Sequence, residues 1–198
     1  MGPMRYIIIG AGAVGGTIGG CLFQGGHEVL LVARGAHLDA LRRDGLRLAT
    51  PLGTEVLPIP AVSGSAEVEL RHDDVLILTT KTQDAEALLA EWAWQPMAGD
   101  ADGAVAAEVV PVVCAQNGVA SERFALRRFR HVYGMYVRLP ATHLEPGERA
   151  GRSPDDGVGR QCGRLPILVK ALPAPGTTHP IGCGKYPNQA SEGFGIGR

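Results

Sequence analysis

The sequence predicts an α/β fold with a doubly wound parallel sheet, on the basis of two observations. Short apolar runs of strand length alternate with segments of helical period through the first 147 of the 198 residues. A glycine cluster joins the first apolar run to the first helical segment. Strands separated by helices pair in parallel, and the helices then cover both faces of the sheet. The chain is long enough for one domain with a sizeable core, and its 45% hydrophobic residues suit a globular protein.

The first elements are predicted in the order strand, glycine turn, helix, strand. Residues 6–9 are apolar and mostly β-branched, which is typical of a buried strand. Residues 13–24 carry apolar side chains at helical spacing, and Gly25 follows them as glycine often follows a helix. Residues 29–32 form a second apolar run. Such a βαβ unit implies a parallel sheet.

The middle of the chain is less regular. A short helix with Leu38 and Leu41 on one face is predicted to end at Gly45. The segment from there to Val62 alternates weakly and is interrupted by prolines. We therefore expect a pair of short edge strands in it.

The cleanest periodic signal follows a predicted strand at residues 75–80. Apolar side chains recur at i, i+3, i+4 and i+7 after it, which predicts an amphipathic helix with Ala85, Leu88, Leu89 and Trp92 on its buried face. The remaining predicted elements are a strand over 109–115, a helix over 121–129 and a strand over 132–139.

The composition changes after Gly147. Residues 148–198 contain ten Gly and six Pro, with one compact apolar run at 165–169. Basic residues outnumber acidic ones there by seven to four, whereas the first 147 residues hold twelve basic and sixteen acidic. Gly and Pro at this density without a repeat indicate disorder or low complexity. We therefore expect one folded domain over 1–147 and an irregular Gly- and Pro-rich tail over 148–198.

Charge and cysteine usage exclude several classes of protein. A net charge of −1 and a pI near 6.6 do not favour nucleic acid or an anionic membrane surface. The apolar run at residues 6–9 is far too short to span a bilayer, and no signal-peptide pattern follows it. The four cysteines are widely scattered and predict neither a metal site nor a redox motif. A cytoplasmic protein with a small-molecule ligand is expected.

The glycine cluster has the pattern G-x-G-x-x-G, formed by Gly10, Ala11, Gly12, Ala13, Val14 and Gly15. It lies between a predicted strand and a predicted helix. There the first glycine permits a tight turn, the second lets the backbone approach a pyrophosphate, and the third lets helix and strand pack closely. The alternative is a flexible glycine loop with no ligand. In this setting the pattern favours a Rossmann-type dinucleotide-binding domain.

The end of the second strand indicates which dinucleotide is bound. Sites for NAD have Asp or Glu about 20 residues past the glycines, where the carboxylate binds the ribose 2′-hydroxyl. Here Arg34 stands at that strand end, and a guanidinium can bind a 2′-phosphate. The pattern therefore predicts NADP. The alternative is a solvated surface arginine, since Arg42 and Arg43 are close in sequence.

Two further polar residues follow predicted strands. Lys81 and Asn117 each come after a strand end, and ligands of open α/β sheets bind in the crevice beyond those ends. The Lys81 ammonium could meet the cofactor or an anionic substrate. A surface lysine is an equal alternative. Asn117-Gly118 alone suggests a hairpin turn, but the helix predicted after it favours a polar side chain at the mouth of the cleft.

Together these segments resemble the N-terminal half of the ketopantoate reductase (2-dehydropantoate 2-reductase) family. The resemblance covers about three-quarters of the chain, and it rests on the glycine motif, on 31–35, on 80–84 with Lys81 and Gln83, and on 116–119 with Asn117. It implies NADPH-dependent reduction of 2-dehydropantoate, or a related 2-oxo acid, on the route to pantothenate and coenzyme A. It also implies that the glycines hold the pyrophosphate, that Arg34 takes the 2′-phosphate, and that Lys81 and Asn117 line the nicotinamide end.

The resemblance further implies a second, helical domain that supplies a lysine to protonate the ketone and much of the substrate pocket. We expect that domain to be absent from this chain, as a shifted reading frame or gene fragment near Gly147 would produce. Lys170 and Lys185 lie in no helical pattern, so no catalytic residue is assigned. The alternative function is a catalytically inactive NADP-binding module. A sheet without its helical partner would expose apolar surface and could self-associate.

Overall fold

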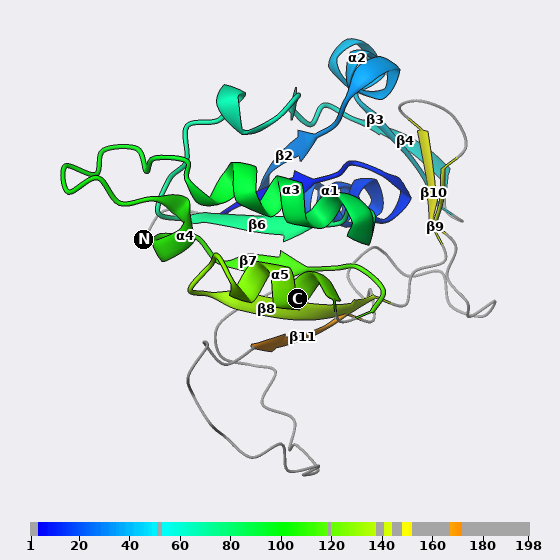
Figure 1. The fold of residues 1–198 in the computed structure, drawn as a ribbon. Helices are drawn as coiled ribbons and strands as arrows, with labels where there is room; N and C mark the ends of the chain where they lie inside the picture. Colours follow the sequence, from blue (N-terminus) through cyan, green and yellow to red (C-terminus); the bar gives the residue numbers. More distant parts are fainter. Residues whose placement is uncertain are drawn as a thin grey trace.

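The computed structural model describes residues 4–50, 53–118, 120–137, 141–143, 148–151 and 167–171. Its main sheet has seven strands in the order β11-β8-β7-β6-β1-β2-β5 (Figure 1). These are β1 (Arg5–Ile9), β2 (Glu28–Val32), β5 (Ala61–Val62), β6 (Asp74–Leu78), β7 (Val112–Cys114), β8 (Val132–Val137) and β11 (Ile167–Ala171). All neighbouring pairs are parallel except β11 with β8. The predicted α/β fold with a parallel sheet is confirmed.

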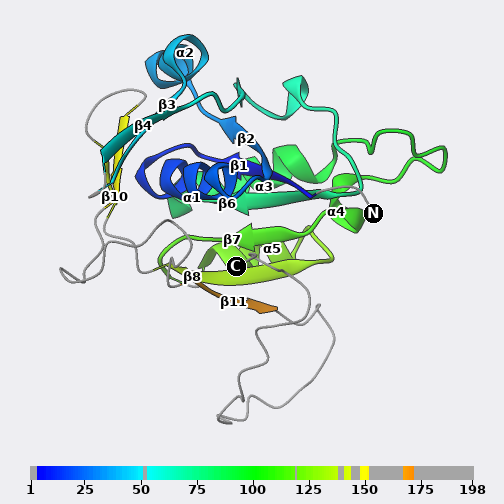
Figure 2. The ribbon, with the colours of Figure 1, turned by 180° about the vertical axis from the view of Figure 1, so that it is seen from behind.

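Helices cover both faces of this sheet. In the described part of the chain they are α1 (Ala13–Gln24), α2 (Gly35–Asp44), α3 (Thr82–Ala93), α4 (Ala106–Val109) and α5 (Ala120–Leu126), with a 3-10 turn η1 (Ser65–Glu67). Figure 1 shows α3 and α5 in front of the sheet, and Figure 2, from behind, shows α1 on the opposite face. The sheet is therefore doubly wound, as the alternation of strands and helices predicts.

Strand β1 is buried on both faces, and its side chains alternate between two apolar clusters. Ile7 and Ile9 pack with Trp92 of α3 on one face. Tyr6 and Ile8 belong to the cluster on the other face, which includes Ile18 of α1. A central parallel strand needs apolar side chains on both sides, which explains why this run does not alternate with polar residues.

A second, four-stranded sheet lies beside the first. It contains the two short strands predicted before Val62, but only the second of them is an edge strand. Its order is β4-β3-β10-β9, with β3 (Leu46–Thr50), β4 (Gly53–Leu57), β9 (Ala141–His143) and β10 (Glu148–Gly151). Only the two-residue β5 joins the edge of the main sheet. Strands β3 and β4 form a separate sheet because the apolar face of their hairpin packs on α1. A Cβ added at Gly20 would lie 3.0 to 3.3 Å from three leucine side chains, those of Leu46, Leu48 and Leu57.

Two strands lie in the segment for which the sequence predicts irregular structure. Strand β10 pairs in parallel with β3, and β11 pairs antiparallel with β8, with Val169 opposite Met135. Strand β11 overlaps the apolar run at 165–169 that stands out in the sequence. The rest of 148–198 lies outside the described residues, and the domain boundary at 147 stays a prediction.

The predicted strand over 109–115 is too long. Val109 ends the short helix α4, Pro111 follows, and β7 begins only at Val112. The apolar run is therefore shared between the end of a helix and a strand. Burial explains the uninterrupted pattern, because Val110 and Val112 are both fully buried. The predicted helix over 121–129 is α5, which ends at Leu126, and β8 is described as far as Val137.

Candidate cofactor-binding site

The site lies where three parallel strands end at the same edge of the main sheet. Ile9 of β1 pairs with Leu78 of β6, and Leu78 pairs with Cys114 of β7. The loops that follow these strands therefore leave the sheet side by side. Strand β2 ends at the same level, because Val32 pairs with Ile9. In an open α/β sheet this edge is where ligands bind.

The glycine loop after β1 has two positions that only glycine fits. Gly10 has a φ of +103°, and a Cβ on it would lie 2.5 Å from Cγ2 of Thr80. A Cβ on Gly15 would lie 2.2 Å from the Gly10 carbonyl oxygen and 2.4 Å from Oγ1 of Thr79. Because both distances are far below van der Waals contact, α1 can approach the strand ends only with glycine at this position.

Thr79, which sequence reasoning missed, holds the glycine loop from the β6 side. Its hydroxyl donates to the Gly10 carbonyl at 2.6 Å, and its N–H donates to the Ile9 carbonyl at 3.0 Å. From the β2 side, the Val32 carbonyl accepts the N–H groups of Gly10 and Ala11 at 3.2 and 2.9 Å. The available signal was a hydroxyl residue at the end of a predicted strand. The loop is thus preorganised.

Helix α1 begins at this loop with uncapped backbone donors. Its N-cap residue is Gly12, which has no side chain to accept a bond from the helix. The first helical bond runs from the Gly16 N–H to the Gly12 carbonyl at 2.7 Å. The N–H groups of the first turn, which includes Ala13, Val14 and Gly15, have no acceptor within the helix. Such a helix start attracts anions through these donors and the helix dipole.

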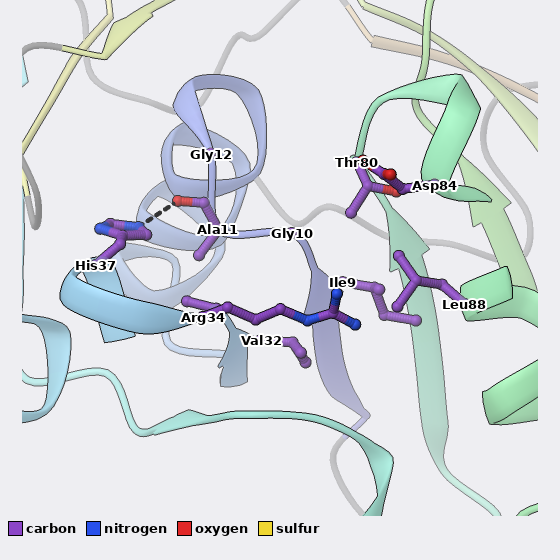
Figure 3. A pocket seen from close by; sticks show the side chains of 11 residues that line it. Ile9, Gly10, Ala11, Gly12, Val32, Arg34, His37, Thr80, Asp84 and Leu88 are labelled. Carbon is purple, nitrogen blue, oxygen red and sulfur yellow. Dashed lines mark hydrogen bonds between the residues drawn. The ribbon is translucent and has the colours of Figure 1, made fainter. Parts of the chain in front are cut away.

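A pocket of about 250 Å³ opens beside the glycine loop (Figure 3). The loop forms one wall, the start of α2 forms the second, and the β6–α3 connection forms the third. Its lining residues are Ile9, Gly10, Ala11, Gly12, Val32, Ala33, Arg34, His37, Thr80, Asp84 and Leu88. The structure therefore brings four of the predicted site residues to one pocket: Gly10, Ala11, Gly12 and Arg34.

Arg34 supplies the positive charge of the pocket. It is the N-cap residue of α2, and its side chain is 71% exposed. Figure 3 shows the guanidinium extended across the pocket, between Val32 and Ile9. Its charged neighbour is Glu91 of α3, at 4.0 Å. An exposed guanidinium here can bind a phosphate with two parallel hydrogen bonds.

His37 is a pocket residue that sequence reasoning missed. Its Nε2 lies 2.7 Å from the Ala11 carbonyl oxygen, so the ring donates a hydrogen bond to the middle of the glycine loop (Figure 3). It follows Arg34 by three residues, which places it in the first turn of α2. This position in the first helical turn after Arg34 was the sequence signal that could have identified His37. His37 thus connects the β2–α2 segment to the loop that begins α1.

Thr80 and Asp84 form the wall that faces Arg34. Oγ1 of Thr80 is buried and has no hydrogen-bond partner in the described part of the chain. Asp84 lies in the first turn of α3 and is exposed. A carboxylate there can accept hydrogen bonds from ribose hydroxyl groups, but it repels phosphate. The pocket is therefore positive toward α2 and negative toward α3.

The other predicted site residues lie at the same edge of the sheet but do not line this pocket. Lys81 is the exposed N-cap residue of α3, and Gln83 is exposed in the first turn of that helix. Asn117 is exposed after β7, beside Gly118, which has a φ of +98°. Next to it, the side-chain amide of Gln116 is buried without a hydrogen-bond partner in the described structure.

No metal cluster is found among the described residues, and the buried Cys114 is not an activated thiol. Burial, together with the charge of Glu122, raises the pKa of the Cys114 thiol to about 12, so this thiol stays neutral. The same residues contain no group of three or more metal-ligating side chains that could hold an ion. Cys162 and Cys183 lie outside the described ranges. No helix in these ranges is long and apolar enough to cross a membrane.

Comparison with known proteins identifies relatives for most of the chain. Residues 6–154 match the family model of ketopantoate reductase, PanE/ApbA. The 2-dehydropantoate 2-reductase of Archaeoglobus fulgidus is 31% identical over 135 residues, which are 68% of this chain and 39% of that protein. The Mesorhizobium japonicum enzyme is 34% identical over 117 residues, 59% of this chain and 32% of that protein. The matched region thus spans about a third of these relatives.

Solved structures agree with the sequence matches. A PanE/ApbA family ketopantoate reductase from Ralstonia eutropha is 28% identical with a TM-score of 0.64, covering 75% of this chain and 46% of that one. A D-mandelate dehydrogenase in complex with NADH and anilino(oxo)acetate is 26% identical with a TM-score of 0.63, covering 75% and 45%. The family match over three-quarters of the chain and the shared Rossmann-type fold lead to one conclusion. This chain belongs to the ketopantoate reductase family.

Proposed function

We propose that this chain binds NADP in the pocket beside the glycine loop. It would thereby form the cofactor-binding part of an NADPH-dependent reductase that converts 2-dehydropantoate, or a related 2-oxo acid, into the 2-hydroxy acid. Membership of the family supports the reaction class. The main evidence for NADP as the cofactor is the uncapped start of α1, which lies beside a pocket with Arg34 on its β2 side. Such a reaction serves pantothenate and coenzyme A synthesis in the cytoplasm.

The described residues fit the parts of NADP one by one. The N–H groups at the start of α1 suit the pyrophosphate, and Gly10 and Gly12 let the backbone come close to it. Arg34 suits the 2′-phosphate, since a guanidinium binds phosphate while a carboxylate at this position would repel it. The bound cofactor supplies the hydride.

Lys81, Gln83 and Asn117 are proposed to lie along the nicotinamide end of the cofactor. The loop with Lys81 and Gln83 follows β6, which neighbours β1, and the loop with Asn117 follows β7, the next strand along, at the edge where the glycine loop lies. A Lys81 ammonium there would attract the carboxylate of a 2-oxo acid or a cofactor phosphate. Reduction of a ketone also needs a proton donor near the carbonyl oxygen. None of the described residues is assigned that role.

The first test is a fluorescence titration of the full chain with NADPH and with NADH. We expect NADPH to bind at least about tenfold more tightly, because charge-assisted hydrogen bonds are worth roughly 1.5–3 kcal/mol. The Arg34→Ala variant should lose this preference. Arg43→Ala is the matched control, since Arg43 lies in the same helix and pairs with Asp44. Equal binding of both cofactors, or of neither, contradicts the proposal.

Turnover with 2-dehydropantoate is measured next. NADPH oxidation that depends on this substrate supports the reductase. Tight NADPH binding without turnover supports the other candidate function, an NADP-binding module that does not catalyse the reaction alone. This second candidate is included because the matched region spans only about a third of the relatives' length.

A further inference from the structure

The arginine proposed to bind the 2′-phosphate has a carboxylate beside it. NH2 of Arg34 lies 4.0 Å from Oε2 of Glu91, and the two side chains are 71% and 39% exposed. Glu91 belongs to α3, one turn beyond Leu88, which lines the pocket opposite α2. Figure 3 shows the guanidinium reaching over the pocket toward that side. Arg34 thus points toward a charge just beyond the opposite wall of the pocket.

Glu91 is held in place by a buried serine. Its Oε1 accepts hydrogen bonds from the N–H of Ser65 at 3.1 Å and from the Ser65 hydroxyl at 2.9 Å. Ser65 is only 2% exposed. Backbone also packs closely here, because a Cβ added at Gly64 would lie 3.0 Å from the same oxygen. The carboxylate cannot follow Arg34 without giving up these bonds.

The turn that holds Glu91 is itself tied to α2. Oε2 of Glu67 accepts a hydrogen bond from NH2 of Arg42 at 2.5 Å, and Oε1 accepts one from the Ser63 hydroxyl at 2.5 Å. Arg42 also donates to the Ala61 carbonyl at 3.1 Å. Glu91 is therefore a negative charge fixed to a supported turn, while Arg34 is a long and exposed side chain that can move.

We propose, on the basis of the proposed function, that Glu91 determines cofactor specificity by competing with the 2′-phosphate of NADP for Arg34. To hydrogen-bond the phosphate, the Arg34 guanidinium must give up its ion pair with Glu91. The carboxylate remains near the phosphate after that, well within the screening length of roughly 8–10 Å in physiological salt. Both effects lower the affinity for NADP and leave NAD, which has no 2′-phosphate, nearly unaffected. Glu91 thus limits the preference that Arg34 creates.

A purely structural role for Glu91 makes a different prediction. If the carboxylate only anchors the turn at Ser65, the Glu91→Gln variant keeps an oxygen that accepts both Ser65 hydrogen bonds. Cofactor affinity would then stay unchanged. If Glu91 competes for Arg34, loss of its charge strengthens binding of the 2′-phosphate. The same variant therefore distinguishes the two roles.

The experiment is calorimetric titration of the full chain with adenosine 2′,5′-bisphosphate and with AMP, which differ only in the 2′-phosphate. We expect Glu91→Gln to bind the bisphosphate about three- to tenfold more tightly, with AMP affinity within twofold of the wild type. Glu86→Gln is the matched control. It removes the same charge from the same helix, where Glu86 pairs with Arg128 at 3.6 Å. This control should change neither affinity.

A second comparison tests whether the effect of Glu91 depends on Arg34. In the Arg34→Ala background, Glu91→Gln should raise bisphosphate affinity by a smaller factor than in the native background, because only the direct repulsion between Glu91 and the phosphate remains. Glu91→Ala, which also removes the charge, tests the same expectation should the first variant fold poorly. Unchanged or weaker bisphosphate binding by both Glu91 variants, or an equal gain for AMP, overturns the inference alone. A wild type that binds the bisphosphate no better than AMP overturns the proposed NADP site as well.

Discussion

Gly15 leaves less room for a side chain than any other residue of the glycine motif. The nearest atoms to an added Cβ are the Gly10 carbonyl oxygen and Oγ1 of Thr79, which are joined by a hydrogen bond. Neither can move without loosening the loop. We expect Gly15→Ala to lower the free energy of unfolding by about 1–3 kcal/mol and to weaken NADPH binding more than tenfold.

Urea denaturation and a fluorescence titration measure the two effects. Gly12→Ala is the control for stability, since an added Cβ there has its nearest neighbour at 4.0 Å and the backbone φ is −68°. It should unfold within about 0.5 kcal/mol of the wild type. A Gly15→Ala protein of native stability and affinity would mean that α1 does not approach the strand ends as described.

His37 offers a second test at the scale of single side chains. Its hydrogen bond to the Ala11 carbonyl joins α2 to the glycine loop. His37→Ala removes that bond, and we expect NADPH affinity to fall about three- to tenfold, since one hydrogen bond is worth roughly 1 kcal/mol. His37→Gln retains a donor and should recover part of the loss. Equal affinities for all three proteins would contradict a positioning role.

The residues of the site differ in how far the sequence could predict them. The glycines and Arg34 follow a spacing whose physical basis is local: a strand, a turn and a helix start. His37 and Thr79 act on backbone carbonyls 26 and 69 positions away, so no local pattern reveals them. The positions proposed for Lys81 and Asn117 came from strand ends and family resemblance, and these roles stay predictions.

Among the elements, the pairing of β1 with β6 depends on a buried ion pair. Arg5 and Asp74 face each other across the two strands, with Nε and NH2 of Arg5 each 2.6 Å from a carboxylate oxygen. The Asp74 side chain is fully buried and also accepts the Arg71 N–H at 2.7 Å. The hydrogen bonds from Arg5 to Asp74, together with the charge of that carboxylate, raise the pKa of the Arg5 guanidinium.

Removal of the Asp74 carboxylate should therefore destabilise the sheet. We expect Asp74→Ala to lower the free energy of unfolding by about 3–5 kcal/mol, the usual cost of leaving one charge of a buried pair alone. Urea denaturation measures it. Asp73→Ala is the control, because that carboxylate approaches Arg71 only to 4.0 Å and is partly exposed. Equal stability of the two variants would show that the pair contributes little.

The elements also show where a sequence pattern stops being informative. Helix α3 and the buried strands could be predicted because their periodicity is contained within each segment. The alternation in Leu46, Leu48 and Leu57 indicates one buried face, but not which surface covers it. That surface is α1, reached through the small Gly20. Pairing of β3 with β10 depends on residues about a hundred positions apart, which no periodicity encodes.

For the whole molecule, two buried acids predict how stability depends on pH. Burial raises the pKa of the Tyr6 phenol and, with the charge of Glu122, that of the Cys114 thiol to about 12, from an ordinary 9.0. Both groups keep their proton in the folded state at a pH where the unfolded chain loses it. Their contribution is complete below about pH 9 and is lost as the pH rises toward 12.

We therefore expect the free energy of unfolding to decrease between pH 9 and 11. The thiol contributes from about pH 9 and the phenol from about pH 10, each by up to about 1.4 kcal/mol per pH unit. Urea denaturation across this range measures the slope. Cys114→Ala removes one of the two groups and should make the slope shallower. A slope that is identical in the variant would mean that the thiol ionises equally in the folded and unfolded states.

The composition of the second sheet has a consequence for how the chain folds during synthesis. Strands β3 and β4 leave the ribosome early, but Ala49 of β3 pairs with Ala150 of β10. Until β10 emerges, one edge of the nascent hairpin presents unpaired backbone groups to any passing strand. The second sheet is therefore completed only after about a hundred further residues have been synthesised, and until then its open edge can pair with another strand.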